Sequence, residues 1–180
     1  MPAIRAPRLT DGQVGLRGLA RSDVPAIVAA CRDPEIPRWT RVPSPYLRED
    51  AERFLAIAAT EAAAGDGISL AVTGGAEDRL IGTVGLMEIH DARGEIGYWI
   101  AAPARGRGAA ARAVRLLCGW AHADLGLTEL EILARRDNVP SQRVAEAAGF
   151  ADTGELRSVA RMPPDRRHGY KRYVWRAPEG

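Results

Sequence analysis

The chain has 180 residues, of which 46% are hydrophobic and 27% are charged, a composition typical of an ordinary globular domain with one substantial core. Its 25 basic and 23 acidic residues leave a net charge of +2, which argues against a dedicated nucleic-acid-binding protein because such proteins usually carry a large basic excess. The sequence shows no apolar run of membrane-spanning length and no signal-peptide pattern. We therefore expect a cytoplasmic protein with neither a nucleic-acid nor a membrane partner.

Few side chains in the sequence suit redox or metal chemistry. Cys31 and Cys118 are the only cysteines, and both fall in helix-like stretches, where we expect buried, reduced thiols. Their positions match neither a zinc site nor a disulfide framework, so no metal is expected. Nearly all basic residues are arginines, with Lys171 the single lysine. Arginine suits forked contacts with phosphates and carboxylates, although genome composition could produce the same bias.

The first half of the sequence predicts a strand, two helices and a β-hairpin. Residues 1–11 carry two prolines and little pattern, so we expect a loose arm. Ser22 or Asp23 is a suitable cap for the first helix, which has Pro25 in its first turn. The expected elements are a strand at 13–19, a helix from the cap to about Arg32, an ordered loop at 33–45, a helix at 47–64, and strands at 68–73 and 80–89 joined across Gly74-Gly75.

The second half continues the alternation of strands and helices. The clearest helix, at 109–125, places Val114, Leu117 and Ala121 on one face. The other expected elements are strands at 95–100, 128–133, 153–159 and 170–176 and a short helix opened by Asn138 and closed by Gly149. The resulting order, β-αα-βββ-α-β-α-ββ, predicts an α/β (α+β) fold in which a mixed sheet is flanked by helices in one domain spanning residues 1–180.

The stretch Ala-Pro-Ala-Arg-Gly-Arg-Gly-Ala-Ala at 102–110 is the strongest functional signal in the chain. It joins the strand at 95–100 to the helix at 109–125. Its small residues let the backbone approach a ligand closely, and the first amides of the helix have no internal partner. Together with the positive end of the helix dipole, they form a site suited to a pyrophosphate. We therefore expect a nucleotide-tailed cofactor.

Three segments in this arrangement resemble the GNAT acyltransferases, which use acetyl-coenzyme A (acetyl-CoA). Residues 105–110, Arg-Gly-Arg-Gly-Ala-Ala, match the family's (Gln/Arg)-x-x-Gly-x-(Gly/Ala) pyrophosphate loop. Residues 138–150 resemble the Asn-x-x-Ser…Gly-Phe segment of the branch that contains the Rim-type ribosomal-protein N-terminal acetyltransferases, and residues 95–100 resemble its central strand. The resemblance covers residues 13–175 and implies a mixed, mostly antiparallel central sheet.

Other phosphate-binding motifs fit this loop less well. A P-loop requires Gly-Lys-Ser/Thr, and the loop contains no lysine. A dinucleotide-binding fold opens with a strand, a glycine-rich turn and a helix, whereas this loop follows a hairpin. Acetyl-CoA is therefore the expected co-substrate.

The resemblance implies how the cofactor is held. The backbone of Ile100 and Ala102 is expected to pair with the pantetheine arm, and the loop amides to hold the pyrophosphate. The arginines of the loop could instead belong to a solvated turn, and Arg143 to a solvated helix face. The expected cofactor-binding residues are Ile100, Ala102, Arg105, Gly106, Arg107, Gly108, Ala109, Ala110, Asn138, Ser141 and Arg143.

Two residues are candidates for the chemistry of acyl transfer to an amine. Glu95, on the central strand, is the first candidate for the base that removes the amine proton; its alternative role is a carboxylate paired with an arginine. The resemblance implies that Ser141 contacts the sulfur of coenzyme A (CoA) and donates a hydrogen bond to it, whereas Asn138 is equally well explained as a plain N-cap. Weaker alternatives for the base are Glu88, His90 and Asp91.

The identity of the acceptor stays open in the sequence. Trp39, Tyr46 and Tyr98 are expected aromatic contacts of an acceptor pocket, although packing over the core is the common alternative for a tryptophan. Acceptor choice is expected to lie in loops such as residues 33–45 and 162–169.

We expect an N-acetyltransferase that acts on a protein N-terminal amine or a small-molecule amine. A homodimer is also implied, because family members often pair. The alternatives are a non-catalytic regulatory module that binds CoA and, ranked last, a nucleotide-binding protein of another fold.

Overall fold

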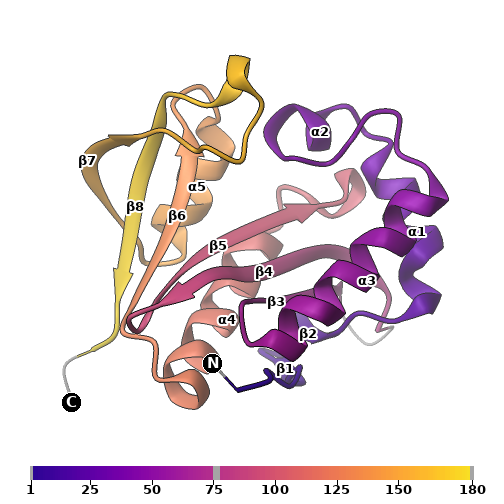
Figure 1. The fold of residues 1–180 in the computed structure, drawn as a ribbon, viewed down its shortest axis with the longest axis horizontal. Helices are drawn as coiled ribbons and strands as arrows, with labels where there is room; N and C mark the ends of the chain where they lie inside the picture. The colour runs from indigo at the N-terminus through magenta and orange to yellow at the C-terminus, as the bar shows by residue number, and fades with distance from the viewer. Residues whose placement is uncertain (1, 75–77, 179–180) are drawn as a thin grey trace.

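Eight strands form a single sheet in the computed structural model, which describes residues 2–74 and 78–178 (Figure 1). The strand order is β1-β2-β3-β4-β5-β6-β8-β7, and every neighbouring pair is antiparallel except β5 and β6. This arrangement confirms the predicted mixed, mostly antiparallel sheet. The strands are β1 (Leu9–Thr10), β2 (Val14–Gly18), β3 (Ile68–Gly74), β4 (Leu80–His90), β5 (Arg93–Ile100), β6 (Glu129–Arg135), β7 (Ala151–Arg157) and β8 (Tyr170–Arg176).

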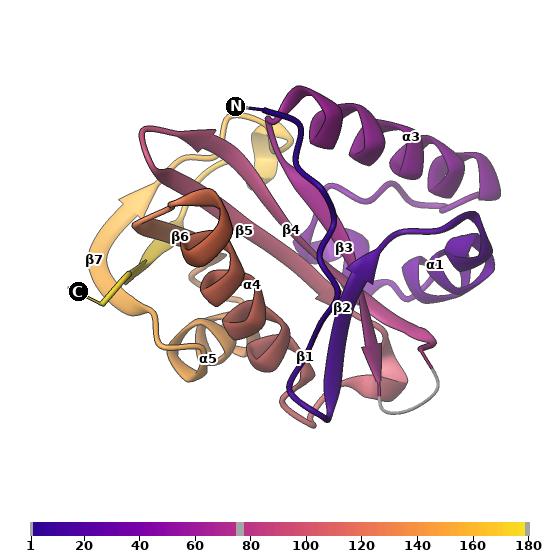
Figure 2. The same cartoon turned by 90° about the horizontal axis from the view of Figure 1, so that it is seen from below.

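Helices cover both faces of the sheet, as Figure 2 shows most clearly. Apolar side chains of α4 and α5 pack with the strands in the largest core cluster, whereas α1, α2 and α3 form a second cluster on the opposite face. Because successive residues of a strand point to opposite faces, β3 contributes Val72 to the first cluster and Ala71 to the second. The helices are α1 (Val24–Cys31), α2 (Glu35–Trp39), α3 (Arg48–Ala64), α4 (Ala109–Leu125) and α5 (Val139–Ala147).

Helix α4 confirms the amphipathic pattern read from the sequence, with the predicted bounds. Val114, Leu117 and Ala121 are fully buried, whereas Arg115 on the opposite face is exposed. Gly126 ends the helix with a φ of +70°, a left-handed conformation that favours glycine. The inward apolar stripe therefore fixes the helix against the sheet, with its first residue held directly after the glycine-rich loop.

Two expectations for the first half of the chain were wrong. The first eleven residues are not a loose arm, because β1 pairs with β2 and the N–H of the buried Ile4 donates to the Ala62 carbonyl at 2.8 Å. The segment at 33–45 is not entirely a loop, because it contains the one-turn helix α2. The Gly74-Gly75 turn of the β3–β4 hairpin falls partly at residue 75, outside the described residues.

A buried ion pair anchors the start of α1. The Arg17 guanidinium donates two hydrogen bonds of 2.8 Å to the Asp23 carboxylate, which also accepts from the Ala20 N–H at 2.8 Å. Burial alone would raise the pKa of Asp23, but these hydrogen bonds and the Arg17 charge outweigh it and lower that pKa. Asp23 thus fixes the turn before α1 and, contrary to the expected capping role, makes no side-chain hydrogen bond to the first amides of that helix.

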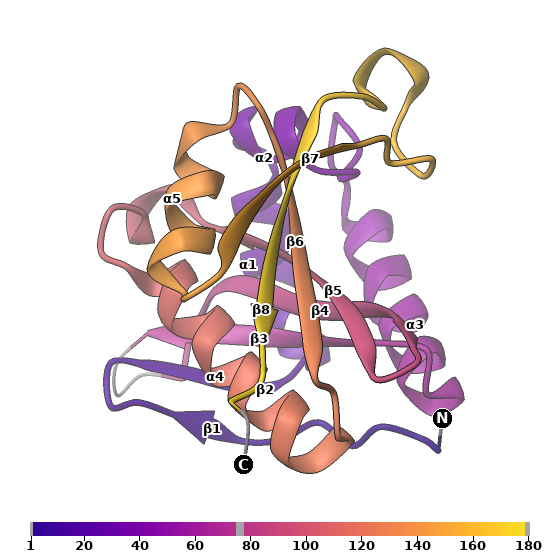
Figure 3. The same cartoon turned by 90° about the vertical axis from the view of Figure 1, so that its left-hand side faces the viewer.

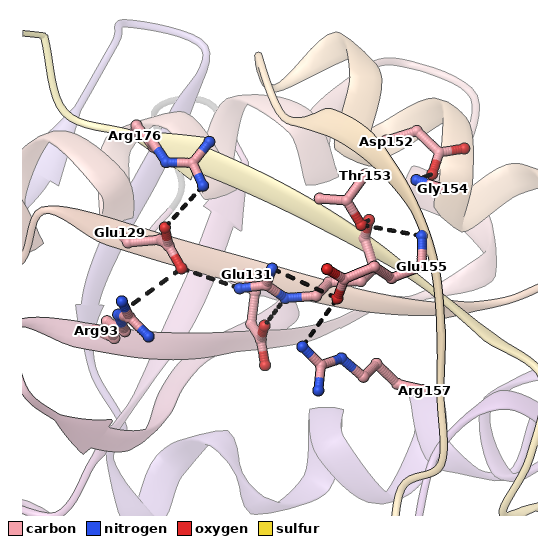
Figure 4. Close-up of polar contacts among 10 residues, drawn as sticks. Arg93, Glu129, Glu131, Asp152, Thr153, Gly154, Glu155, Arg157 and Arg176 are labelled. Carbon is pink, nitrogen blue, oxygen red and sulfur yellow. Dashed lines mark hydrogen bonds and ion pairs between the residues drawn. The ribbon is translucent and has the colours of Figure 1, made fainter.

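Three strands, β6, β8 and β7, form the far edge of the sheet (Figure 3). Charged side chains tie them together (Figure 4). Arg172 on β8 donates to Glu131 at 2.6 Å and to Glu129 at 2.9 Å on β6. Lys171 points to β7, where its Nζ lies 2.5 Å from the Asp152 carboxylate. These contacts neutralise the carboxylates on this part of the sheet. Within residues 2–74 and 78–178, no helix combines the length and apolarity that a membrane crossing requires.

Candidate active site

The sheet opens between β5 and β6. Their parallel pairing covers only Arg93 to Glu95 against Glu129 to Glu131, and beyond this point the two strands diverge (Figure 1). On the β4 side, the Ala101 N–H donates to the Ile81 carbonyl at 2.8 Å. Because main-chain groups alternate in direction along a strand, those of Tyr98 and Ile100 face the opening. β5 therefore presents a strand edge there, although the Ile100 carbonyl already accepts from Arg105 Nε at 2.8 Å.

The glycine loop (residues 105–108) lies between this edge and the start of α4. Gly106 and Gly108 both have a φ of +75°, and a Cβ built on either would meet no described atom within 4 Å. The loop thus places two conformations that favour glycine directly before the helix start, where the first amides lack partners within the helix. This open cradle of main-chain donors fits a pyrophosphate, and Ala109 and Ala110 form the first two residues of the helix behind it.

The arginines near the loop differ in their surroundings. Arg105 Nη1 lies 2.7 Å from Asp33 Oδ2, an ion pair whose angles fall short of a hydrogen bond. Arg107 and Arg143 are exposed and make no ion pair or side-chain hydrogen bond within the described residues. Arg105 therefore fastens the loop to the segment before α2. Arg107 and Arg143 are solvated, which is the alternative to phosphate contact that the sequence left open.

Ser141 and Tyr98 come together from elements that are far apart in the sequence. Asn138 caps α5, since its Oδ1 accepts from the Ser141 N–H at 3.2 Å. The Tyr98 hydroxyl lies 2.8 Å from Ser141 Oγ and donates to the Ser141 carbonyl at 3.3 Å. Burial raises the pKa of Tyr98 to about 12, although the Ser141 contact opposes the rise. The phenol therefore stays protonated at neutral pH and can act only as a hydrogen-bond donor or acceptor.

Glu95 is a buried carboxylate on the opposite face of β5 from Tyr98. Its residue is only 7% exposed, and its side chain is bonded to Arg161, from the β7–β8 connection. Burial raises the pKa of Glu95, with Arg161 opposing the rise and the charges of Glu131 and Glu88 adding to it. The arginine pairing expected as the alternative to catalysis is thus present. It does not remove Glu95 from consideration, because a raised pKa suits a general base near neutral pH.

The weaker candidates for the base lie in a different environment. Glu88, His90 and Asp91 are all exposed around the β4–β5 turn. Glu88 reaches Arg161 only at 3.8 Å, and a ring nitrogen of His90 is 2.7 Å from the Glu88 carbonyl. Glu95 is the one of these four acidic and imidazole groups that is buried.

A groove of about 660 Å³ lies on the Glu95 side of the sheet. Residues from two segments, 37–44 and 160–167, line it. These are largely the two loops that we expected to determine acceptor choice. Arg161 belongs both to the lining and to the Glu95 ion pair, so one side chain connects the groove with the buried carboxylate.

The three aromatic residues expected in the acceptor pocket do not line this groove. Tyr46 is 5% exposed and packs in the core cluster of α1, α2 and α3. Tyr98 instead joins Ser141 on the other face of β5. Two guanidinium groups contact the Trp39 ring, with Arg38 4.6 Å and Arg135 5.7 Å from its centre. The apolar bodies of these rings are used in packing and cation–π contacts rather than in the groove wall.

Comparisons with known proteins place this geometry in a family. A family model described as an acetyltransferase (GNAT) domain matches residues 13–151. The Bacillus subtilis protein named "Probable N-acetyltransferase YjcK" is 39% identical over 91 residues, which are 48% of this chain and 49% of that protein. The chain therefore spans about half the length of the curated relatives it matches.

Two solved structures share the fold. One is RimJ of Mycobacterium smegmatis in complex with CoA-disulfide, with a TM-score of 0.81 at 18% identity over 97% of this chain and 85% of that chain. The other is RimL, the ribosomal L7/L12 α-N-protein acetyltransferase, bound to CoA through a cysteine disulfide, with a TM-score of 0.79 at 16% identity over 94% of this chain and 98% of that chain. At this identity the likeness establishes the fold alone. Taken with the family match, it shows that the chain belongs to the GNAT acetyltransferase family and has Rim-type structural neighbours.

Proposed function

We propose that the protein is an N-acetyltransferase that moves an acetyl group from acetyl-CoA to a primary amine by direct attack in a ternary complex. The acceptor is a protein N-terminal amine or a small-molecule amine. The observation that carries the proposal is the opening between β5 and β6, which has the glycine loop and Ser141 on one face and Glu95 with the groove on the other. A cofactor and an acceptor that approach from opposite sides of the sheet would meet at this opening.

The residues around the opening fit CoA. The amides at Gly106, Gly108, Ala109 and Ala110 would hold the pyrophosphate, and the β5 edge that continues to Ala102 would bond the pantetheine amides as an added strand does. When bound, acetyl-CoA supplies the acetyl group as an activated thioester.

The chain's own side chains then divide the chemistry. Ser141 is placed to donate a hydrogen bond to sulfur when the single phenol proton of Tyr98 turns from the Ser141 carbonyl to Ser141 Oγ, which leaves the serine proton for sulfur. Glu95 accepts the amine proton, directly or through water. This task is modest for a protein N-terminus, whose pKa is about 8, compared with about 10.4 for a lysine. For the carboxylate to act, Arg161 must release its bond to Glu95 or share it with the acceptor.

A thiol-release assay tests the proposal. Purified protein is mixed with acetyl-CoA and a panel of peptides and small amines, and free CoA is measured over time. We expect turnover with at least one primary amine, and a fall in kcat of about 10-fold or more for Ser141→Ala with little change in CoA affinity. Ser22→Ala, at an exposed serine of the η1 turn (Arg21–Asp23), is the matched control and should behave as wild type.

The alternative of a regulatory module makes a different prediction. Saturable CoA binding by calorimetry with no turnover across the panel would exclude the acetyltransferase and favour the module. We also propose a cytoplasmic location and pairing into a homodimer, the latter tested by light scattering after size-exclusion chromatography, where a mass near 19.4 kDa would mean a monomer.

A further inference from the structure

The groove beside Glu95 is lined by basic residues. Four arginines are among its lining, Arg41 on one wall and Arg161, Arg166 and Arg167 on the other. No aspartate or glutamate is among the described residues that line it. Asp165 stands on the exposed η3 turn (Pro164–Arg166) near these arginines but is not part of the lining. The groove thus carries a marked positive charge, although the chain as a whole is close to neutral.

Among the described residues, only one of these four charges has a carboxylate partner. Arg161 is paired with Glu95. Arg166 donates to the Pro37 carbonyl at 2.6 Å, and Arg167 donates to the Met162 carbonyl at 3.2 Å. A carbonyl orients a guanidinium but does not cancel its charge. Arg41 is exposed and makes no ion pair or side-chain hydrogen bond within the described part of the chain. Three positive charges in the groove are therefore left without compensation.

The two walls are also fastened to each other. The bond from Arg166 to Pro37 crosses from the β7–β8 connection to the segment around α2, and a second bond joins Arg166 to the Arg38 carbonyl at 3.2 Å. The Arg38 and Arg135 charges near Trp39 are paired with Glu35 and Asp137. The groove therefore exists before an acceptor enters, and the two charges beside Trp39 are compensated, unlike those of Arg41, Arg166 and Arg167 in the lining.

From these observations we infer that the acceptor is anionic: a peptide whose N-terminal amine is followed by acidic side chains. This inference rests on the proposed function and names its substrate class. Guanidinium groups on opposite walls of a 660 Å³ groove suit several carboxylates spread along an extended chain better than a single anion. The amine enters toward Glu95, and the following carboxylates meet Arg41, Arg166 and Arg167. Polyamines and basic N-termini are repelled by the same charges.

Three peptides of equal length and identical first residue test the inference, with acidic, neutral amide or basic side chains at positions 2–4. We expect kcat/KM to fall in that order, with an acidic peptide favoured over the neutral one by about 10-fold at low salt, since exposed ion pairs contribute a few-fold each. The preference should reside in KM and shrink as ionic strength rises. Equal or better use of the neutral or basic peptide would overturn the inference.

A matched pair of variants locates the preference. Arg41→Glu should reduce the acidic-to-neutral ratio of kcat/KM several-fold, mainly by raising KM for the acidic peptide. Arg21→Glu makes the same charge change at an exposed arginine outside the groove and should leave the ratio unchanged. An unchanged ratio in Arg41→Glu would contradict the assignment.

Peptide binding to the CoA-saturated protein, followed by fluorescence anisotropy, separates this inference from the proposed function. If no peptide is turned over but the acidic peptide still binds best, the acetyltransferase proposal fails and the anionic groove stands. If turnover occurs with no preference for acidic peptides, only the inference fails. Selective use of O-phosphoethanolamine, a small phosphorylated amine, over all peptides would likewise refute a peptide acceptor.

Discussion

The glycine at the start of α4 gives the sharpest test of how the cofactor is held. We predict that Gly108→Ala weakens CoA binding far more than it weakens the fold. Gly108 has a φ of +75°, and Gly126, at the other end of the same helix, has a φ of +70°; a Cβ at either would meet no described atom within 4 Å. Gly126→Ala is therefore a matched control with the same backbone strain, away from the glycine loop.

The expected magnitudes follow from this geometry. A left-handed L-residue costs about 1–2 kcal/mol, partly offset by the smaller conformational freedom of alanine in the unfolded chain. Each variant should thus lose about 1 kcal/mol, which lowers Tm by about 2–4 °C for a chain of this size. At Gly108 the methyl group would also extend into the open space at the start of α4, where the pyrophosphate is proposed to bind. Loss of one hydrogen bond to a charged group costs about 1.5–3 kcal/mol, or roughly a 10- to 100-fold rise in the Kd for CoA.

Differential scanning fluorimetry and isothermal titration calorimetry measure the two effects separately. Similar falls in Tm with a selective loss of CoA affinity in Gly108→Ala would support a pyrophosphate at this loop. Wild-type affinity in Gly108→Ala, or an equal loss in Gly126→Ala, would refute the reasoning.

Three further predictions address the base, the buried ion pair and the thiols. Glu95→Gln should slow turnover by about 100-fold or more at the acid end of the assay range, and this loss of rate should shrink as pH approaches the pKa of the amine. A loss of rate that does not change with pH would instead assign Glu95 a structural role through Arg161. Asp23→Asn should destabilise the protein by about 2 kcal/mol at pH 7 in urea unfolding, because it removes the main carboxylate partner of the buried Arg17. Asp78→Asn, which changes the exposed partner of Arg17, should destabilise the protein less. Folding lowers the pKa of Asp23, so its carboxylate stabilises the folded protein above its unfolded pKa of about 3.9, and this stabilisation is lost as pH falls through the folded pKa. The difference in unfolding free energy between the wild type and Asp23→Asn should therefore narrow toward pH 3. Cys31 and Cys118 are each 2% exposed, and burial raises the pKa of both thiols to about 12. After incubation with CoA disulfide, mass spectrometry should therefore show thiol adducts only on the denatured protein. An adduct on the native protein would contradict this prediction.

The fold could be predicted from the sequence wherever a strong local period was present. Helix α4 has the predicted bounds because a complete apolar stripe defines it. Strand β8 also has the predicted bounds, although its burial does not alternate residue by residue. β1 was missed because two residues show no period. α2 was missed because Pro37 argues against a helix, although proline is tolerated in a first turn.

The candidate site was predictable where its parts are local and unpredictable where they are not. The glycine loop and the Asn138 cap each lie within a few neighbouring residues, and the cap is confirmed. The pairing of Glu95 with Arg161 joins residues 66 positions apart, and that of Tyr98 with Ser141 joins residues 43 apart. No local pattern encodes such contacts. Tyr46 packs in the core, and its role as an acceptor contact stays a prediction, because composition does not show whether an aromatic ring faces a pocket or the core.

The ion pair between β7 and β8 has a consequence for the protein's own chemistry. Lys171 carries the only side-chain amine in the sequence, and its hydrogen bond to Asp152 raises its pKa. An ammonium group has no lone pair to attack a carbonyl. Under the proposed function, a thioester bound to the chain therefore meets no competing lysine nucleophile, and the arginines supply positive charge without a side-chain amine that could be acylated.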